Sequence, residues 1–167
     1  SGKSSIGKRL ADRLGYLFFD TGVMYRAVTY LALRELGSAL DERAVTALAL
    51  RAHIDVLPPT VEDGRDCTIL AGIGGQSAED ITWAIRSKDV ESSVSLVAAV
   101  QAVRRVLTEQ MRQVGLRGQV VMVGRDVGTV VFPDAAAKFY LDVSAEVRAG
   151  RQAAELRAAG QQVDEGR

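Results

Sequence analysis

The sequence predicts an α/β fold in which a parallel sheet forms the middle of three layers, between helices. Short, mostly apolar runs at 17–19, 120–123 and 138–141 have the length of buried strands. Longer segments with helical periodicity, among them 101–116, separate these runs. Strands that alternate with helices in this way are typical of a parallel sheet that is covered on both faces.

The composition limits the classes of function. A length of 167 residues fits one domain, with room for an inserted subdomain. The formal net charge is zero, so we expect no nucleic acid as a partner. Cys67 is the only cysteine, which excludes an internal disulfide and favours a reducing compartment, the cytoplasm. No apolar run reaches the ~18 residues that a membrane span needs, so we expect no membrane partner either.

The first residues, Ser1-Gly2-Lys3-Ser4, match the end of the phosphate-binding pattern G-x-x-x-x-G-K-[ST]. In the full pattern, Lys3 would reach the β and γ phosphates and the Ser4 hydroxyl would hold Mg²⁺. A chance Gly-Lys-Ser at a helix start is the alternative. A helix should follow and end at Gly15, with an inward face made of Ile6, Leu10 and Leu14. Because the chain begins inside the motif and without Met, we expect a fragment.

A strand–turn–helix unit comes next. The turn Asp20-Thr21-Gly22 ends the strand and caps a helix over 23–36. Thr21 and Tyr25 are four residues apart and share a face near the start of that helix, with Arg26 beside them. Polar groups thus follow the carboxyl end of a strand, where open parallel sheets bind ligands. The alternatives are that Tyr25 is a half-buried core aromatic and Arg26 a surface charge.

Residues 38–100 show a different pattern of expected elements from the rest of the chain. The glycine-rich stretch 72–75 indicates a hairpin turn, because no Gly-Lys follows it. His53 has no Cys or His partner nearby in the sequence, so it is a poor metal ligand, and we expect Cys67 and Trp83 in the core. The expected elements are a helix at 41–51, strands at 53–57 and 67–71 around a polar turn at 61–65, and helices at 80–86 and 90–100.

A polar loop follows the strand at 120–123. Gly124 breaks the strand, and Arg125 and Asp126 stand side by side at its carboxyl end, where ligands sit in open parallel sheets. A guanidinium there can bind a phosphate through two N–H groups at once, and a carboxylate can accept a hydrogen bond from an amino or hydroxyl group. A charged turn between two strands is the alternative. The preceding helix should turn inward the residues Val103, Val106, Leu107 and Met111.

The loop at 124–135, Gly-Arg-Asp-Val-Gly-Thr-Val-Val-Phe-Pro-Asp-Ala, closely resembles the signature loop of bacterial cytidylate kinases. Asp-Thr-Gly-Val-Met-Tyr-Arg-Ala-Val-Thr at 20–29 and Ser-Gly-Lys-Ser at 1–4 resemble two further blocks of that family, in its order and at about its spacing. The resemblance implies a P-loop kinase core at 1–37 and 101–167, which includes the start of a lid. It also implies an α+β monophosphate-binding insert at 38–100, and a family sequence that continues past both ends of this chain.

The activity that the resemblance implies is transfer of the γ-phosphoryl group of ATP to CMP or dCMP, with Mg²⁺ as cofactor. We expect a monomer. The implied catalytic residues are Lys3, Arg125, Arg148 and Arg151. ATP would bind at Ser1, Gly2, Lys3 and Ser4, with Ser4 on the magnesium. CMP would bind at Thr21, Tyr25, Arg26, Ser95, Arg104, Arg125 and Asp126, with the phosphate on Arg26 and Arg125 and the cytosine on Arg104 and Asp126.

Two positions depart from the family pattern. Val123 stands where the family usually has an acid near the metal, and Gln152 stands where a second arginine usually follows Arg151. Losing one electrostatic contact to a transition state typically lowers the rate by about 10²–10³. Two other functions therefore stay open. One is a non-catalytic nucleotide-binding module of the same fold, and the other is a P-loop kinase of another small acceptor.

Overall fold

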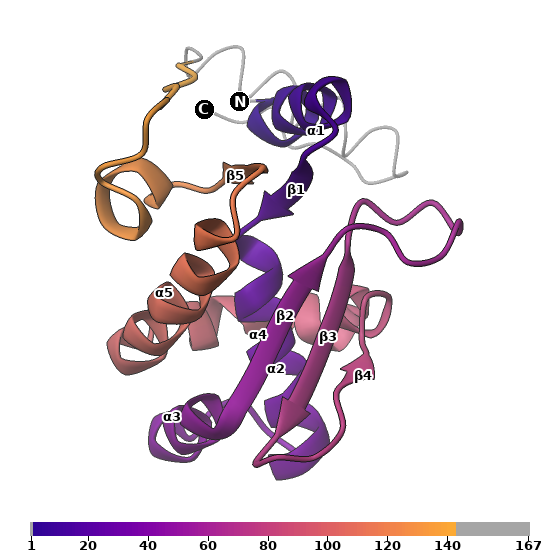
Figure 1. Ribbon diagram of the computed structural model, residues 1–167. Helices are drawn as coiled ribbons and strands as arrows, with labels where there is room; N and C mark the ends of the chain where they lie inside the picture. The colour runs from indigo at the N-terminus through magenta and orange to yellow at the C-terminus, as the bar shows by residue number, and fades with distance from the viewer. Residues whose placement is uncertain (1, 143–167) are drawn as a thin grey trace, which may run out of the picture.

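The computed structural model describes residues 2–142 (Figure 1). Within that range, no helix has the length and apolar character that a membrane span requires. The elements are, in chain order, α1 (Lys3–Leu14), β1 (Leu17–Asp20), α2 (Gly22–Leu36), α3 (Glu42–Arg51), β2 (Ala52–Leu57), β3 (Thr68–Ile73), β4 (Glu79–Asp80), a 3-10 turn η1 (Ala84–Arg86), α4 (Lys88–Ala99), α5 (Gln101–Leu116), β5 (Val120–Val123) and a π-helical turn η2 (Val127–Val131).

The parallel sheet pairs β1 with β5, in a register that runs from Leu17 beside Val120 to Asp20 beside Val123. Because side chains alternate along a strand, the two faces of the pair differ. Phe18 and Val123 pack with α1, and Phe19 packs into the main core on the other side. Helices therefore cover both faces of the sheet, and the predicted mixed α/β fold with a parallel sheet is confirmed.

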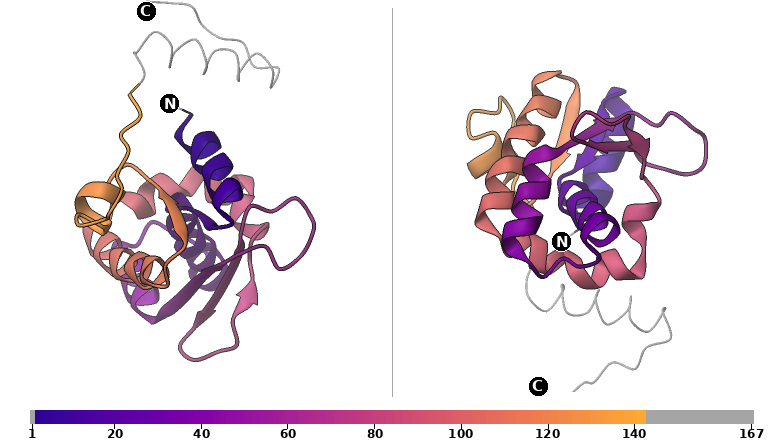
Figure 2. Two further views of the ribbon diagram at one scale, coloured as in Figure 1. Left: turned by 45° about the horizontal axis from the view of Figure 1, so that its top comes forward. Right: turned by 90° about the horizontal axis from the view of Figure 1, so that it is seen from below.

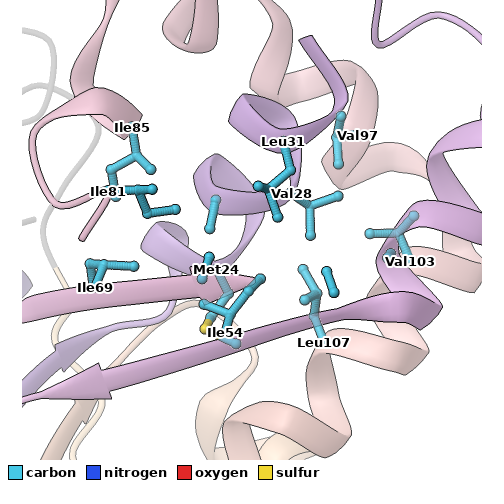
Figure 3. Close-up of a cluster of buried hydrophobic side chains, with 14 of the residues drawn as sticks. Met24, Val28, Leu31, Ile54, Ile69, Ile81, Ile85, Val97, Val103 and Leu107 are labelled. Carbon is cyan, nitrogen blue, oxygen red and sulfur yellow. The ribbon is translucent and has the colours of Figure 1, made fainter. Parts of the chain in front are cut away.

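The main core lies around α2. Side chains of α2 meet those of α4, α5, β2 and β3 in one cluster, as Figure 3 shows. Met24, Leu31 and Leu107 are fully enclosed there. The predicted helix at 101–116 has the predicted inward face, since Val103, Leu107 and Met111 are buried. This cluster is the hydrophobic mass that fixes the positions of α2 and α5.

A second sheet, antiparallel and in the order β2-β3-β4, lies against this core. The glycine stretch after β3 is the turn of the β3–β4 hairpin, with positive φ at Gly74 and Gly75. The loop between β2 and β3 projects from the molecule in both views of Figure 2. Side chains from 38–100 share the main core with α2 and α5, and the division into a core and an insert remains a prediction.

The predicted inward face of α1 is wrong. Ile6, Leu10 and Leu14 are 52%, 38% and 50% exposed, whereas Gly7 and Ala11 are buried against the sheet. The reason is that α1 lies very close to β5 at this point, because a Cβ atom at Gly7 would lie 2.5 Å from Val123 Cγ2. The helix therefore packs through its small residues, and its larger apolar residues lie on its outer side.

Three smaller expectations also fail. The run 138–141 is no strand: it pairs with no other strand in residues 2–142, and Phe139 and Tyr140 are largely exposed. The expected helix at 80–86 is the end of β4 and one 3-10 turn, because Asp80 pairs with Leu70 in the hairpin. Trp83 is 47% exposed rather than in the core, since its indole Nε1 donates to Asp63 at 2.7 Å.

Candidate active site

The carboxyl ends of β1 and β5 lie side by side, and the chain turns there into α2 and into the 124–126 loop. This edge is where open parallel sheets bind their ligands. The first turn of α1 reaches the same edge, since Ser4 contacts the last residue of β1. Three of the motif segments found in the sequence therefore meet at one place.

The turn after β1 depends on Asp20. Its Oδ1 accepts from the Gly22 N–H at 3.0 Å at the start of α2, and its Oδ2 accepts from the Ser4 hydroxyl at 2.9 Å. Thr21 is buried, and its hydroxyl donates to the Val123 carbonyl at 3.2 Å. The turn thus starts α2 as expected, through the carboxylate of Asp20, while Thr21 ties the end of β1 to the end of β5.

Gly124 lets the two strand ends approach this closely. A Cβ atom there would lie 2.4 Å from Thr21 Oγ1 and 2.6 Å from Val127 Cγ2. Any other residue would therefore push the loop away from α2. The glycine fixes how near Asp126 comes to the helix that carries Tyr25.

Tyr25, Arg104 and Asp126 form one cluster beyond this turn. Arg104 Nη2 donates to Asp126 Oδ2 at 2.5 Å, and the guanidinium lies 5.7 Å from the centre of the Tyr25 ring. Burial raises the pKa of the Tyr25 phenol, opposed by the Arg104 charge and supported by that of Asp126. The phenol is therefore neutral and able to donate at physiological pH, beside a charged pair whose members are held in place by each other.

The predicted phosphate ligands differ in their surroundings. The Arg26 guanidinium is 3.9 Å from the Glu91 carboxylate of α4, and Arg125 is exposed at the start of the loop. Ser95 is exposed on α4, one helical turn after Glu91, so the two residues share a face. The structure brings Arg26 within reach of α4, and it joins neither Ser95 nor Arg125 to the cluster by a hydrogen bond within residues 2–142.

Gly2, Lys3 and Ser4 form the beginning of α1. Gly2 has a φ of 74°, and its carbonyl accepts from the Ile6 N–H at 3.1 Å. The N–H groups of the first helical turn have no intrahelical partners, which makes such an end favourable for phosphate. The predicted residues Ser1, Arg148 and Arg151, and Gln152, lie outside the described residues.

The donor set near Ser4 suits a hard cation. The Ser4 hydroxyl and the Asp20 carboxylate oxygen are 2.9 Å apart. Mg²⁺ prefers oxygen ligands, and the hydrogen bond to Asp20 leaves lone pairs of the Ser4 hydroxyl oxygen available to a cation. No larger His, Cys, Asp and Glu cluster occurs in residues 2–142, and magnesium that is bound with nucleotide phosphates needs only one or two protein groups.

Comparison with known proteins shows the family of the chain. The family model for cytidylate kinase matches residues 1–166. The chain belongs to the cytidylate kinase family. A cytidylate kinase from Herpetosiphon aurantiacus is 52% identical over 163 residues, which cover 98% of this chain and 69% of the relative. One from Chloroflexus aggregans is 53% identical, over 94% of this chain and 66% of the relative, and one from Roseiflexus castenholzii is 49% identical, over 98% and 69%.

Membership confirms the family that the sequence motifs indicated. Cytidylate kinases are ATP-dependent nucleoside monophosphate kinases, and kinases generally use ATP together with a divalent metal. Neither of the two other functions gains support from the relatives. The chain spans about two thirds of the length of these curated relatives.

Sequence reasoning missed two groups at this site. The first is Asp20, which the sequence indicates only as part of a cap and which also accepts a hydrogen bond from the Ser4 hydroxyl. The second is Glu91 of α4, which faces Arg26. A carboxylate at the end of the strand that follows a Gly-Lys-Ser motif was the available signal for Asp20. Nothing local indicated Glu91, because its contact joins two helices far apart in the sequence.

Proposed function

We propose that the protein transfers the γ-phosphoryl group of ATP to CMP or dCMP and so forms CDP or dCDP. The observation that carries the proposal is the Arg104–Asp126 pair over Tyr25, at the carboxyl ends of β1 and β5. This pair offers one fixed donor and one fixed acceptor at the sheet edge where open parallel sheets bind ligands.

The chemistry of cytosine suits this pair. Its exocyclic N4 amino group is a donor, which a carboxylate such as that of Asp126 accepts. Its ring N3 and O2 are acceptors for the Arg104 guanidinium, which has five N–H donors. Uracil would turn its O4 acceptor toward Asp126 instead. Two acceptors that face each other cost free energy, so we expect poor use of UMP.

The remaining polar groups divide between the two substrates. We assign Arg26 and Arg125 to the phosphate of CMP, because both are arginines at strand ends or helix starts on the acceptor side. We assign Lys3 and the first turn of α1 to the phosphates of ATP, and the Ser4 hydroxyl to Mg²⁺. Arg148 and Arg151 are assigned to the group in transfer on resemblance alone.

The reaction needs no covalent intermediate. An oxygen of the CMP phosphate attacks the γ-phosphorus in line, and the bond to the β-phosphate oxygen of ATP breaks. Bound magnesium would supply neutralising positive charge to the ATP phosphates. The residues of this chain orient the acceptor phosphate and balance the charge that spreads over the transferred group. A cytoplasmic location and a monomeric state are parts of the same proposal.

The test is ADP formation from ATP with CMP, dCMP, UMP or AMP as acceptor, in the presence of Mg²⁺. We expect turnover with CMP and dCMP only. Arg125→Ala should lower CMP turnover by about 10²–10³, the usual cost of one lost electrostatic contact to the transferred group. Arg43→Ala, at an exposed position of α3, is the matched control and should change little.

Each other outcome has a definite meaning. CMP turnover by Arg125→Ala within about twofold of the parent would remove Arg125 from the acceptor site. Binding of ATP and CMP without turnover would indicate a binding module, with Val123 and Gln152 as the first positions to restore. A preference for an acceptor other than cytidylate would refute the assignment of Arg104 and Asp126.

A further inference from the structure

Asp20 connects the two halves of the site. One of its carboxylate oxygens accepts from the Ser4 hydroxyl at the start of α1, at 2.9 Å, and the other accepts from the Gly22 N–H at the start of α2, at 3.0 Å. Ser4 and Asp20 are 16 residues apart, so this hydrogen bond exists only because β1 returns the chain to the start of α1. The contact is a product of the tertiary fold.

The neighbouring strand offers no other acid at this level. Val123 is the register partner of Asp20, and equivalent residues of a parallel pair project from the same face. Val123 is apolar and packs with Ala11 of α1, where Gly7 leaves space for it. Of the two strand ends that face the start of α1, only the end of β1 carries a negative charge.

We propose that Asp20 is a positioning residue for the divalent cation that accompanies ATP, and that it acts through Ser4. The carboxylate holds the Ser4 proton, so the lone pairs of the hydroxyl oxygen are free to face the cation. This inference rests on the proposed function, because it assumes that Ser4 faces the metal of an ATP complex.

The main competing role for Asp20 is structural. Through its Oδ1 it also satisfies a backbone N–H at the start of α2. Asp20→Asn separates the two roles, because the amide oxygen can still accept from the Gly22 N–H. The same change removes the charge and puts an NH₂ group or a weaker acceptor against Ser4. The variant should therefore fold with α2 intact.

The experiment compares nucleotide affinity with and without metal. The non-hydrolysable ATP analogue AMP-PNP is titrated into the parent chain in EDTA and in Mg²⁺, and Mn²⁺ binding in its presence is followed by electron paramagnetic resonance. Asp20→Asn should keep the affinity in EDTA within about twofold, and should lower the gain on adding metal by about tenfold or more, as loss of groups that orient metal ligands does.

Two controls sharpen the result. Asp12→Asn removes the same charge from the exposed side of α1, where its partner is Lys8, and should leave the metal gain unchanged. Ser4→Ala tests the route of action. If Asp20 acts through Ser4, the double variant should lose little more of the metal gain than Ser4→Ala alone, because coupled sites are not additive.

The outcomes separate this inference from the proposed function. An unchanged metal gain in Asp20→Asn, or equal losses in EDTA and in Mg²⁺, would overturn the inference even if CMP turnover by the parent stands. A lost metal gain in Asp20→Asn would support it even if the parent shows no CMP turnover, since AMP-PNP binding does not depend on the acceptor. Additive losses in the double variant would refute the action through Ser4.

Discussion

The two faces of the parallel sheet are covered in different ways. On one face, α2 and α5 enclose large side chains such as Phe19, Met24 and Leu107, all fully buried. On the other face, α1 contributes Ala11 and Gly7 to a small cluster, and its larger apolar residues are exposed. Most residues proposed for CMP lie on α2, α4 and α5 or in the 124–126 loop, and the described residues proposed for ATP lie at the start of α1. The helices that carry the proposed CMP site are therefore held in place by burial of large side chains. The helix that carries the proposed ATP site is held by close packing of small residues against the sheet.

The largest effect should come from matched leucine truncations on the two sides. Leu107→Ala leaves a cavity in the main core and should lower the free energy of unfolding by about 2–5 kcal/mol. Leu14→Ala removes a side chain that is half exposed and should change it by less than about 0.5 kcal/mol. Urea unfolding followed by circular dichroism measures both. Equal losses would contradict the contrast between the two faces.

Adding a single methyl group to α1 should have the next largest effect. In Gly7→Ala the new Cβ would lie 2.5 Å from Val123 Cγ2, so the helix or the strand must move. We expect a loss of about 1–3 kcal/mol of unfolding free energy, typical of overpacking. Ser5→Ala, on the exposed side of the same helix, is the control.

A second substitution tests the cause of that loss. Val123→Ala removes the atom that Gly7→Ala would contact, so the double variant should regain part of the stability that Gly7→Ala loses. Strictly additive losses would mean that α1 is not held by close approach at this point.

A substitution of Arg104 tests the proposed CMP site without changing the main core. Arg104→Ala leaves Asp126 without its cation and removes the proposed donors to cytosine. Loss of a hydrogen bond to a charged group costs about 1.5–3 kcal/mol, so kcat/KM for CMP should fall by about 10–100-fold. Arg105→Ala, at the exposed neighbouring position of α5, should leave kcat/KM unchanged. An equal fall in both variants would point to a general effect on α5.

The same contrast explains what the sequence could predict. The helix at 101–116 and the strand pair were predictable because long periodic segments and apolar runs are local signals. The inward face of α1 was not, because an apolar stripe normally indicates the buried side, and close packing through Gly7 depends on the partner strand. The run 138–141 failed for a related reason, since a strand needs a neighbour that no local pattern specifies.

For the candidate site, the sequence predicts which residues take part better than it predicts their contacts. Thr21, Tyr25 and Asp126 are indicated by their positions after strand ends and Arg104 by the family resemblance, and the structure brings the four residues together near the two strand ends. The contact from Asp20 to Ser4 could not be predicted from spacing, because it needs the return of β1 to the start of α1. Sequence patterns thus located residue types, and tertiary contacts determined which atoms face each other.

The smallest effect concerns Cys67, which lies in the main core. Burial raises the pKa of its thiol from 9.0 to about 11, with a further rise from Asp66 and opposition from Arg86. The unfolded chain therefore releases this proton at lower pH than the folded chain does, so the stability that the buried neutral thiol contributes is lost as pH rises above 9. Relative to Cys67→Ala, whose side chain does not titrate, the parent should lose about 0.8 kcal/mol of unfolding free energy between pH 8 and 9.5. Urea unfolding at these two pH values measures the difference. Parallel pH profiles for the two proteins would contradict this prediction and would show that water reaches the Cys67 thiol in the folded protein.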